Sequence, residues 1–246
     1  MRRVTFVRLV LLALFAVTLT AAAAHAADPQ FARLETGEGE ILLVFYPELA
    51  PNHVRNFVHL ARNGFFDGSK FHRIVPGFVI QGGDPNSKDD DPENDGMGGP
   101  KLADVLSADE AAVLAKINAE LAAGGYVPLP VDKANLKQEF SQTAKHVRGS
   151  LSMARSQHVD SAGSQFFICV ADTPGLDGKY TIFGHTVLGL DVVDAIVDAE
   201  QSPPGSQKPV APVTLAKVTI IDGVAGLTPE EKAAWEALPA SLQSVE

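Results

Sequence analysis

Residues 71–85, FHRIVPGFVIQGGDP, are the most informative part of this sequence. They place one cation, Arg73, and one amide side chain, Gln81, in a predicted strand–turn–strand unit around Pro76-Gly77, among mostly apolar side chains. A guanidinium stays charged at physiological pH and presents several N–H donors in a fixed plane. Beside a dry apolar pocket, such a group favours a reaction that needs electrostatic stabilisation but neither proton transfer nor a nucleophile.

Two further stretches complete the pattern. Residues 149–155 (GSLSMAR) lead to residues 163–168 (GSQFFI), and residues 176–184 have the sequence LDGKYTIFG. In this order, the stretches resemble the signature of the cyclophilins, a family of peptidyl-prolyl cis-trans isomerases. The resemblance runs from about residue 31 to residue 223 and is interrupted by one insertion. It implies a mainly β fold, a closed eight-stranded antiparallel β-barrel capped by two helices, with a helical insertion and a short C-terminal helix added.

The resemblance also implies a site for proline-containing polypeptides that needs no metal, cofactor or covalent intermediate. Arg73 would donate a hydrogen bond to the prolyl nitrogen of an Xaa-Pro bond, and Gln81 would bind the substrate backbone and help to hold the guanidinium. The alternatives are a surface ion pair for Arg73 and simple core packing for the apolar positions. The other implied substrate-binding residues are Phe78, Val79, Ala154, Arg155, Gln165, Phe167, Leu176 and Tyr180.

The chain departs from the family pattern at three positions. Val79 stands where members often carry Met, and Tyr180 stands where many carry His. Gly175 stands where some members carry Trp, which removes an aromatic face and makes tight binding of the cyclic peptide cyclosporin doubtful. None of these changes removes Arg73 or Gln81, so we expect isomerase activity to be retained.

Hydrophobic periodicity independently predicts a β-rich chain with a few helices. A helix is expected to begin at Pro51 and end near Arg62, and we expect both of its histidines, His53 and His59, to be surface residues. Phe166 is expected to point away from the site into the core, because side chains alternate along a strand. The expected strands are 31–36, 40–46, a bent strand or strand pair over 71–80, 151–154, 165–171 and 213–221; a second helix is expected over 190–197.

Residues 1–26 have the order of a secretory signal peptide: a basic start, an apolar run and an A-x-A pattern that ends at Ala26. The apolar run is shorter than the ~20 residues that cross a bilayer. We therefore expect cleavage after Ala26, no remaining membrane span and a periplasmic location; an uncleaved anchor is the alternative. The isomerase domain is then expected over residues 27–223, and a helical tail over 224–246.

Charge and cysteine content argue against a nucleic-acid-binding protein, a disulfide-stabilised fold and a thiol enzyme. Loss of the three arginines in residues 1–26 lowers the formal net charge from −10 to −13, which argues against nucleic acid as a partner. The single cysteine, Cys169, excludes an internal disulfide, and its apolar surroundings in sequence indicate a buried core residue instead of a catalytic thiol. The sequence indicates no particular oligomeric state.

Residues 88–135 are interpreted as a family loop enlarged by an inserted helical hairpin or lid. Its acidic start partly matches a calcium loop, but Leu102 stands where a bidentate Glu is needed, so a solvated loop is preferred. Ser107 and Glu110 form a capping box before a predicted helix over 111–123. The apolar stripe of this helix comprises Val113, Leu114, Ile117 and Leu121. We hypothesise that an insert beside the binding groove affects which substrates bind.

The end of the chain carries its own helix signal. Thr228 and Glu231 form a second capping box, which predicts a helix over 230–238. Trp235 is interpreted as a docking residue and not a catalytic one, and the sequence leaves open whether the tail docks on its own domain or on a partner. Two functions remain open. One is an exported isomerase that accelerates the folding of extracytoplasmic proteins, and the other is a binding module that only holds proline-bearing segments.

Overall fold

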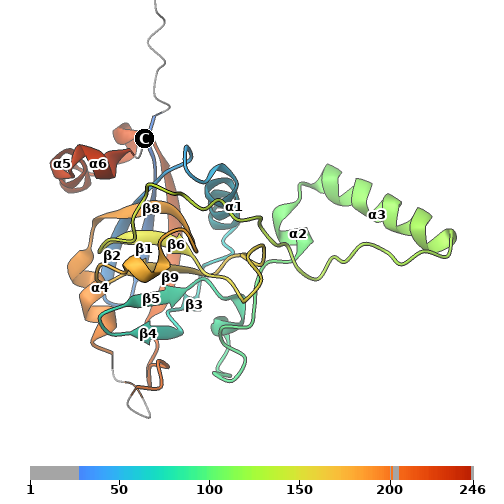
Figure 1. Cartoon of the computed structure of the whole chain (residues 1–246), viewed down its shortest axis with the longest axis horizontal. Coiled ribbons are helices and arrows are strands. Elements are labelled where there is room, and N and C mark those ends of the chain that lie inside the picture. The colour runs from blue at the N-terminus through green and yellow to red at the C-terminus, as the bar shows by residue number, and fades with distance from the viewer. Residues whose placement is uncertain (1–27, 200, 202–204, 245–246) are drawn as a thin grey trace, which may run out of the picture.

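The computed structural model describes residues 28–199, 201 and 205–244, so the expected signal peptide lies outside the described residues. The helices in this part of the chain are all too short or too polar to span a bilayer. One antiparallel sheet dominates the fold, and Figure 1 shows it curled, with α1 and α4 beside it. Its strands are β1 (Gln30–Thr36), β2 (Gly39–Phe45), β3 (Ser69–Lys70), β4 (Arg73–Val75), β5 (Val79–Gly82), β6 (Ser150–Met153), β7 (Phe166–Cys169), β8 (Thr181–Leu188) and β9 (Thr214–Asp222).

The prediction of a closed eight-stranded barrel is wrong in two respects. Within the described residues the sheet has nine strands, in the order β3-β9-β1-β2-β8-β6-β7-β5-β4, and its hydrogen bonds do not join the first strand to the last. The reason is a bend at Phe71-His72, which divides one stretch of chain into two short strands. β3 pairs with β9, whereas β4 pairs with β5. The two edges of the sheet are therefore consecutive in the chain.

Helices cover the curled sheet and complete its core. The helix α1 (Pro51–Arg62) packs against β9 and β8, and α4 (Leu190–Val197) packs against β2. Phe57 of α1 lies 4.6 Å from Phe66 and 5.4 Å from Phe166, measured between ring centroids. Phe166 is fully buried in this aromatic cluster, as the alternation of its strand predicts.

One histidine of α1 contradicts its prediction as a surface residue. His53 is fully buried, because its ring packs inward and its Nδ1 lies 2.6 Å from Glu139 Oε2. Glu139 also accepts hydrogen bonds from the backbone N–H groups of Asn52 and His53, and so satisfies donors in the first turn of the helix. Residue spacing does not reveal this partner, which lies 86 positions away. His59 is partly exposed.

The insertion contains α2 (Leu102–Val105) and α3 (Ala108–Ala123), with the capping box between Ser107 and Glu110 that the sequence predicts. Figure 1 shows α3 projecting away from the sheet, so it does not form a lid over it. No residue of α3 is buried. We call residues 102–131 the arm. The segment before it, residues 85–99, is rich in Asp and Glu and begins with the 3-10 helix Pro85–Lys88; we call it the acidic loop.

The C-terminal tail docks on the first strand of its own domain, which decides between the two possibilities that the sequence leaves open. Helices α5 (Pro229–Ala237) and α6 (Ala240–Gln243) form it. Glu231 accepts two hydrogen bonds from the Arg33 guanidinium, both of 2.7 Å. The ring of Trp235 meets Phe31 edge-on at 5.2 Å between ring centroids. A bidentate ion pair and an aromatic contact therefore fix the tail to β1.

Acid should destabilise the fold through His185 of β8. Burial lowers the pKa of His185 to about 4, below the ordinary value of 6.5. Between pH 6.5 and 4 the unfolded chain binds a proton that the native state does not, so stability is lost as the pH falls through this window, by about 3 kcal/mol in all. Urea denaturation at pH 7.5, 5.5 and 4.5 measures this loss. The His185→Gln variant should lose distinctly less stability, and equal losses in both proteins would contradict the assignment.

The tail should depend on the pair between Arg33 and Glu231. Glu231→Gln leaves the guanidinium without its buried carboxylate and should destabilise tail docking by about 2 kcal/mol. Trp235 is the only tryptophan in the chain, so its fluorescence during urea titration reports undocking directly. The control is Lys232→Gln on the same helix, because the Lys232–Glu236 pair is exposed and contributes little. A midpoint shift of equal size in both variants would refute this account.

Candidate active site

The β4–β5 hairpin places the two polar residues of the central sequence stretch side by side. Pro76-Gly77 makes its turn: Gly77 has a φ of +70°, and Phe78 N donates to Val75 O at 2.9 Å. This turn sets the register in which Arg73 lies opposite Gln81. Residues directly opposite in an antiparallel pair share one face of the sheet. Arg73 Nη1 accordingly donates to Gln81 Oε1 at 3.1 Å.

A third residue holds the other side of the guanidinium. Arg73 Nε donates to Gln207 Oε1 at 2.8 Å, and the backbone oxygen of Gln207 accepts from Ile74 N at 2.8 Å. Gln207 has a φ of +64°, a left-handed conformation that among the described residues no other non-glycine residue adopts. No sequence pattern marks this contact, because 134 positions separate the two side chains.

Within the described residues, the charge of Arg73 is not neutralised by an ion pair. Burial lowers the pKa of Arg73, and Tyr180 opposes this effect, but a guanidinium stays protonated at physiological pH. No carboxylate within the described ranges forms a salt bridge with Arg73, so the alternative of a surface ion pair is wrong. Its neighbours are neutral amides, which orient the group without cancelling its charge.

The guanidinium lies at a cavity of about 330 Å³, a volume at the small end of ligand sites. Its floor belongs to a small apolar cluster in which Val79, Phe167 and Cys169 are buried. Val79 and Phe167 therefore serve both core packing and the cavity wall. The cavity is lined by Arg73, Phe78, Val79, Gln81, Ala154, Arg155, Phe167, Leu176 and Tyr180, which are nine of the ten residues predicted for the site.

Aromatic contacts stiffen the cavity wall. Tyr180 meets Phe167 edge-on at 5.7 Å, and Arg155 Cζ lies 4.6 Å from the centroid of the Tyr180 ring. His146 stacks on Phe167 from another side and is held by Asp177 and Ser152. The sequence analysis did not predict this contact between His146 and Phe167. The predicted core role of Cys169 is confirmed, because the residue is fully buried. Burial also raises the pKa of its thiol to about 11.

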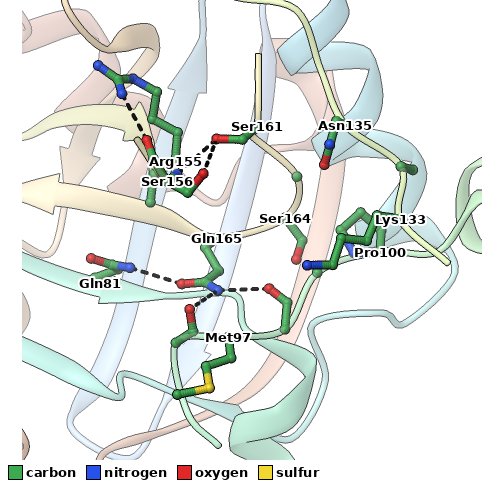
Figure 2. A pocket seen from close by; sticks show the side chains of 16 residues that line it. Gln81, Met97, Pro100, Lys133, Asn135, Arg155, Ser156, Ser161, Ser164 and Gln165 are labelled. Atoms are coloured by element: carbon green, nitrogen blue, oxygen red, sulfur yellow. Dashed lines mark hydrogen bonds between the residues drawn. The ribbon is translucent and has the colours of Figure 1, made fainter. Parts of the chain in front are cut away.

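The tenth predicted residue, Gln165, connects the first cavity to a second one. Gln81 Nε2 donates to Gln165 Oε1 at 3.0 Å, and Gln165 Nε2 donates to Gly98 O at 2.8 Å, as Figure 2 shows. The second cavity also measures about 330 Å³ and shares Gln81, Ala154 and Arg155 with the first. The two cavities thus form one groove. Its far end is lined by both ends of the insertion: Gly96, Met97, Gly98, Gly99, Pro100, Lys133, Ala134 and Asn135.

The arrangement suits neutral, electrostatic chemistry on an extended peptide. In the described part of the chain, His, Cys, Asp and Glu side chains do not gather into a set of three that could bind a metal ion. His72, which the sequence places beside Arg73, is buried against the acidic loop and does not line either cavity. An apolar cavity with the Arg73 guanidinium at its rim can bind a small ring and act on a polar atom attached to it.

Comparison with known proteins agrees with this geometry. The family model described as cyclophilin type peptidyl-prolyl cis-trans isomerase/CLD matches residues 31–220. A probable peptidyl-prolyl cis-trans isomerase of Brucella abortus (strain 2308) is 36% identical over 222 residues, which cover 88% of this chain and 97% of that protein. A peptidyl-prolyl cis-trans isomerase of Helicobacter pylori (strain ATCC 700392 / 26695) is 36% identical over 172 residues, 69% of this chain and 82% of the relative.

A solved structure extends the agreement to three dimensions. The cyclophilin type isomerase of Cryptosporidium parvum, crystallised in the presence of the dipeptide Ala-Pro, aligns with a TM-score of 0.59 and 25% identity, over 78% of this chain and 98% of that one. The family match contains the hairpin with Arg73 and Gln81, and also the strand with Phe167. This chain therefore belongs to the cyclophilin-type peptidyl-prolyl cis-trans isomerases.

Proposed function

We propose that this isomerase rotates Xaa-Pro bonds in unfolded or folding extracytoplasmic proteins, and that Arg73 donates a hydrogen bond to the prolyl nitrogen. The observation that carries the mechanism is a guanidinium that pairs with no carboxylate among the described residues and that two glutamine side chains hold at the rim of an apolar cavity. The order of residues 1–26 supports the extracytoplasmic location.

The reaction itself explains the need for such a donor. Amide resonance opposes rotation with a barrier of about 18–20 kcal/mol, so uncatalysed isomerisation takes tens to hundreds of seconds. In the planar amide, the nitrogen lone pair is delocalised and accepts no hydrogen bond. In the twisted amide, the nitrogen becomes pyramidal and its lone pair becomes an acceptor. A donor at this position stabilises the transition state and not the ground state, which is the condition for catalysis.

One nitrogen of the Arg73 guanidinium, Nη2, is available to donate to the prolyl nitrogen. Nε is bonded to Gln207 and Nη1 to Gln81, whereas Nη2 makes no hydrogen bond to the residues that the structure describes. Partial burial strengthens its interaction with a polar atom, because the local dielectric is low. Val79, Phe167 and Leu176 would receive the proline ring, and Gln81 and Gln165 would hold the peptide backbone.

Weak binding of cyclosporin, which Gly175 suggests, remains a prediction. The side-chain direction at Gly175 is open space, with no atom within 4 Å of an added Cβ. The aromatic face that some family members carry there is therefore not replaced by a neighbour. We expect cyclosporin to bind this protein weakly.

Arg73→Ala should lower kcat/KM by about 10²–10³-fold, because it removes a donor that acts only in the transition state. The measurement is a protease-coupled assay of cis-trans isomerisation on a proline tetrapeptide. Arg73→Lys keeps the charge but loses the planar fork, and we expect it to recover only part of the activity. Unfolding midpoints should stay close to that of the unmodified protein. Retention of activity within two-fold in Arg73→Ala would refute the mechanism and favour a binding module.

Gln207 should act as a positioning residue. Gln207→Gly keeps the left-handed backbone, because glycine adopts it readily, and removes only the acceptor of the Arg73 Nε hydrogen bond. We expect kcat for the tetrapeptide to fall about ten-fold with KM nearly unchanged, since a hydrogen bond to a charged group contributes about 1.5–3 kcal/mol. Ser206→Ala, in the same loop, contacts Lys208 instead of Arg73 and is the control. Equal kcat values in the two variants would contradict the role.

A further inference from the structure

Exposed apolar side chains are concentrated in and beside the arm, residues 102–131. Nine large hydrophobic residues are exposed among those that the structure describes, and seven of these lie between residues 97 and 131. The seven are Met97, Val113, Ile117, Tyr126, Val127, Leu129 and Val131. A group of this kind on a soluble domain indicates a binding surface, whereas single exposed hydrophobic residues do not.

Hydrogen bonds within residues 102–131 and at their base hold the arm in a defined conformation. The side chain of Asn118 joins α3 to the returning chain by two hydrogen bonds with Leu129, of 3.1 and 2.8 Å. Leu102 N donates to Val131 O, and Ala134 N donates to Pro100 O, so the base of the arm is closed. Leu102, Leu106, Val113, Leu114 and Ile117 line an apolar groove of about 420 Å³ between α2 and α3. The arm thus keeps apolar side chains in a fixed arrangement without burying them.

The arm is continuous with the substrate groove. Pro100 and residues 133–135, which flank its two ends, line the second cavity, and this cavity shares Gln81, Ala154 and Arg155 with the cavity of Arg73. A peptide that crosses Arg73 and enters the second cavity therefore reaches the base of the arm. Helix α3 has 16 residues, about 24 Å at 1.5 Å per residue. An extended chain covers that length with about seven residues.

The formal charge of the arm favours one kind of ligand over another. The arm carries four carboxylates, at Asp104, Asp109, Glu110 and Glu120, and one ammonium group, at Lys116, for a formal charge of −3. Two copies of this chain would bring two such surfaces together and repel each other. An apolar segment that contains basic residues would be attracted instead.

We infer that the arm binds apolar, basic stretches of the same unfolded polypeptide whose proline occupies the Arg73 cavity. The inference rests on the proposed function, because it extends the binding of that substrate. Contacts on the arm are equal in the ground state and in the transition state, so they lower KM for long substrates without changing kcat. A tetrapeptide is too short to reach the arm and gains nothing from it.

The test compares two triple variants on opposite faces of α3. Val113→Ser, Ile117→Ser and Leu121→Ser remove the apolar stripe; Ala112→Ser, Ala115→Ser and Ala119→Ser change the other face and serve as the control. The long substrate is a reduced, alkylated protein whose refolding is limited by one Xaa-Pro bond. For this substrate, the stripe variant should raise KM about ten-fold with kcat unchanged, and the control should change neither. Both variants should retain tetrapeptide turnover within two-fold.

Three outcomes would overturn the inference. The first is an unchanged KM in the stripe variant, and the second is an equal loss of activity on the tetrapeptide and on the protein substrate. The third is sedimentation that shows the unmodified protein as a dimer and the stripe variant as a monomer.

The Arg73→Ala variant tests this inference separately from the catalytic proposal. With its arm intact, Arg73→Ala should still bind the fluorescently labelled unfolded protein with unchanged anisotropy, although it no longer turns it over. Full turnover by Arg73→Ala would refute the catalytic proposal and leave the inference about the arm unaffected.

Discussion

The proposed reaction places one constraint on the site: a cation must be held at the rim of an apolar cavity without a carboxylate beside it. A carboxylate would fix the guanidinium more firmly, but it would cancel the field that acts on the substrate. Two neutral glutamines, Gln81 and Gln207, solve this problem by accepting hydrogen bonds from different edges of Arg73. Each comes from a different part of the chain, so the geometry exists only in the folded protein.

The surrounding structure serves the same constraint. The Pro76-Gly77 turn sets the register that brings Gln81 to Arg73, and strand alternation sends Phe167 to the cavity and Phe166 to the core. Polar support continues from Gln81 through Gln165 to the loop at the base of the arm. A row of amides therefore extends from the Arg73 guanidinium along the groove, and a peptide backbone can exchange hydrogen bonds with it.

Local signals made much of this predictable. The capping boxes at Ser107 and Thr228 set helix starts that the structure confirms, since a cap needs only residues three positions apart. The residues of the Arg73 cavity were predicted through the family resemblance, because they cluster in three contiguous stretches. Periodicity alone predicted strands and helices, and the arrangement of the sheet came from the resemblance.

Contacts between distant segments were not predictable in the same way. The burial of His53 depends on Glu139, and the orientation of Arg73 depends on Gln207; neither partner is marked by spacing or composition. The open order of the sheet depends on a two-residue bend, which a hydrophobic pattern does not register. The exposure of the stripe on α3 was also hidden, because an apolar stripe has the same sequence whether or not another element covers it.

The way in which the sheet ends has a consequence for solubility. Its two boundary strands, β3 and β4, contain only two and three residues and follow each other along the chain. A longer unpaired strand would offer a template on which another extended polypeptide could add itself. An isomerase whose substrates are proline-containing peptides brings other chains close to its own sheet, so this hazard applies to it. By keeping both borders so short, the fold leaves incoming chains the groove, and not its own backbone, as a place to attach.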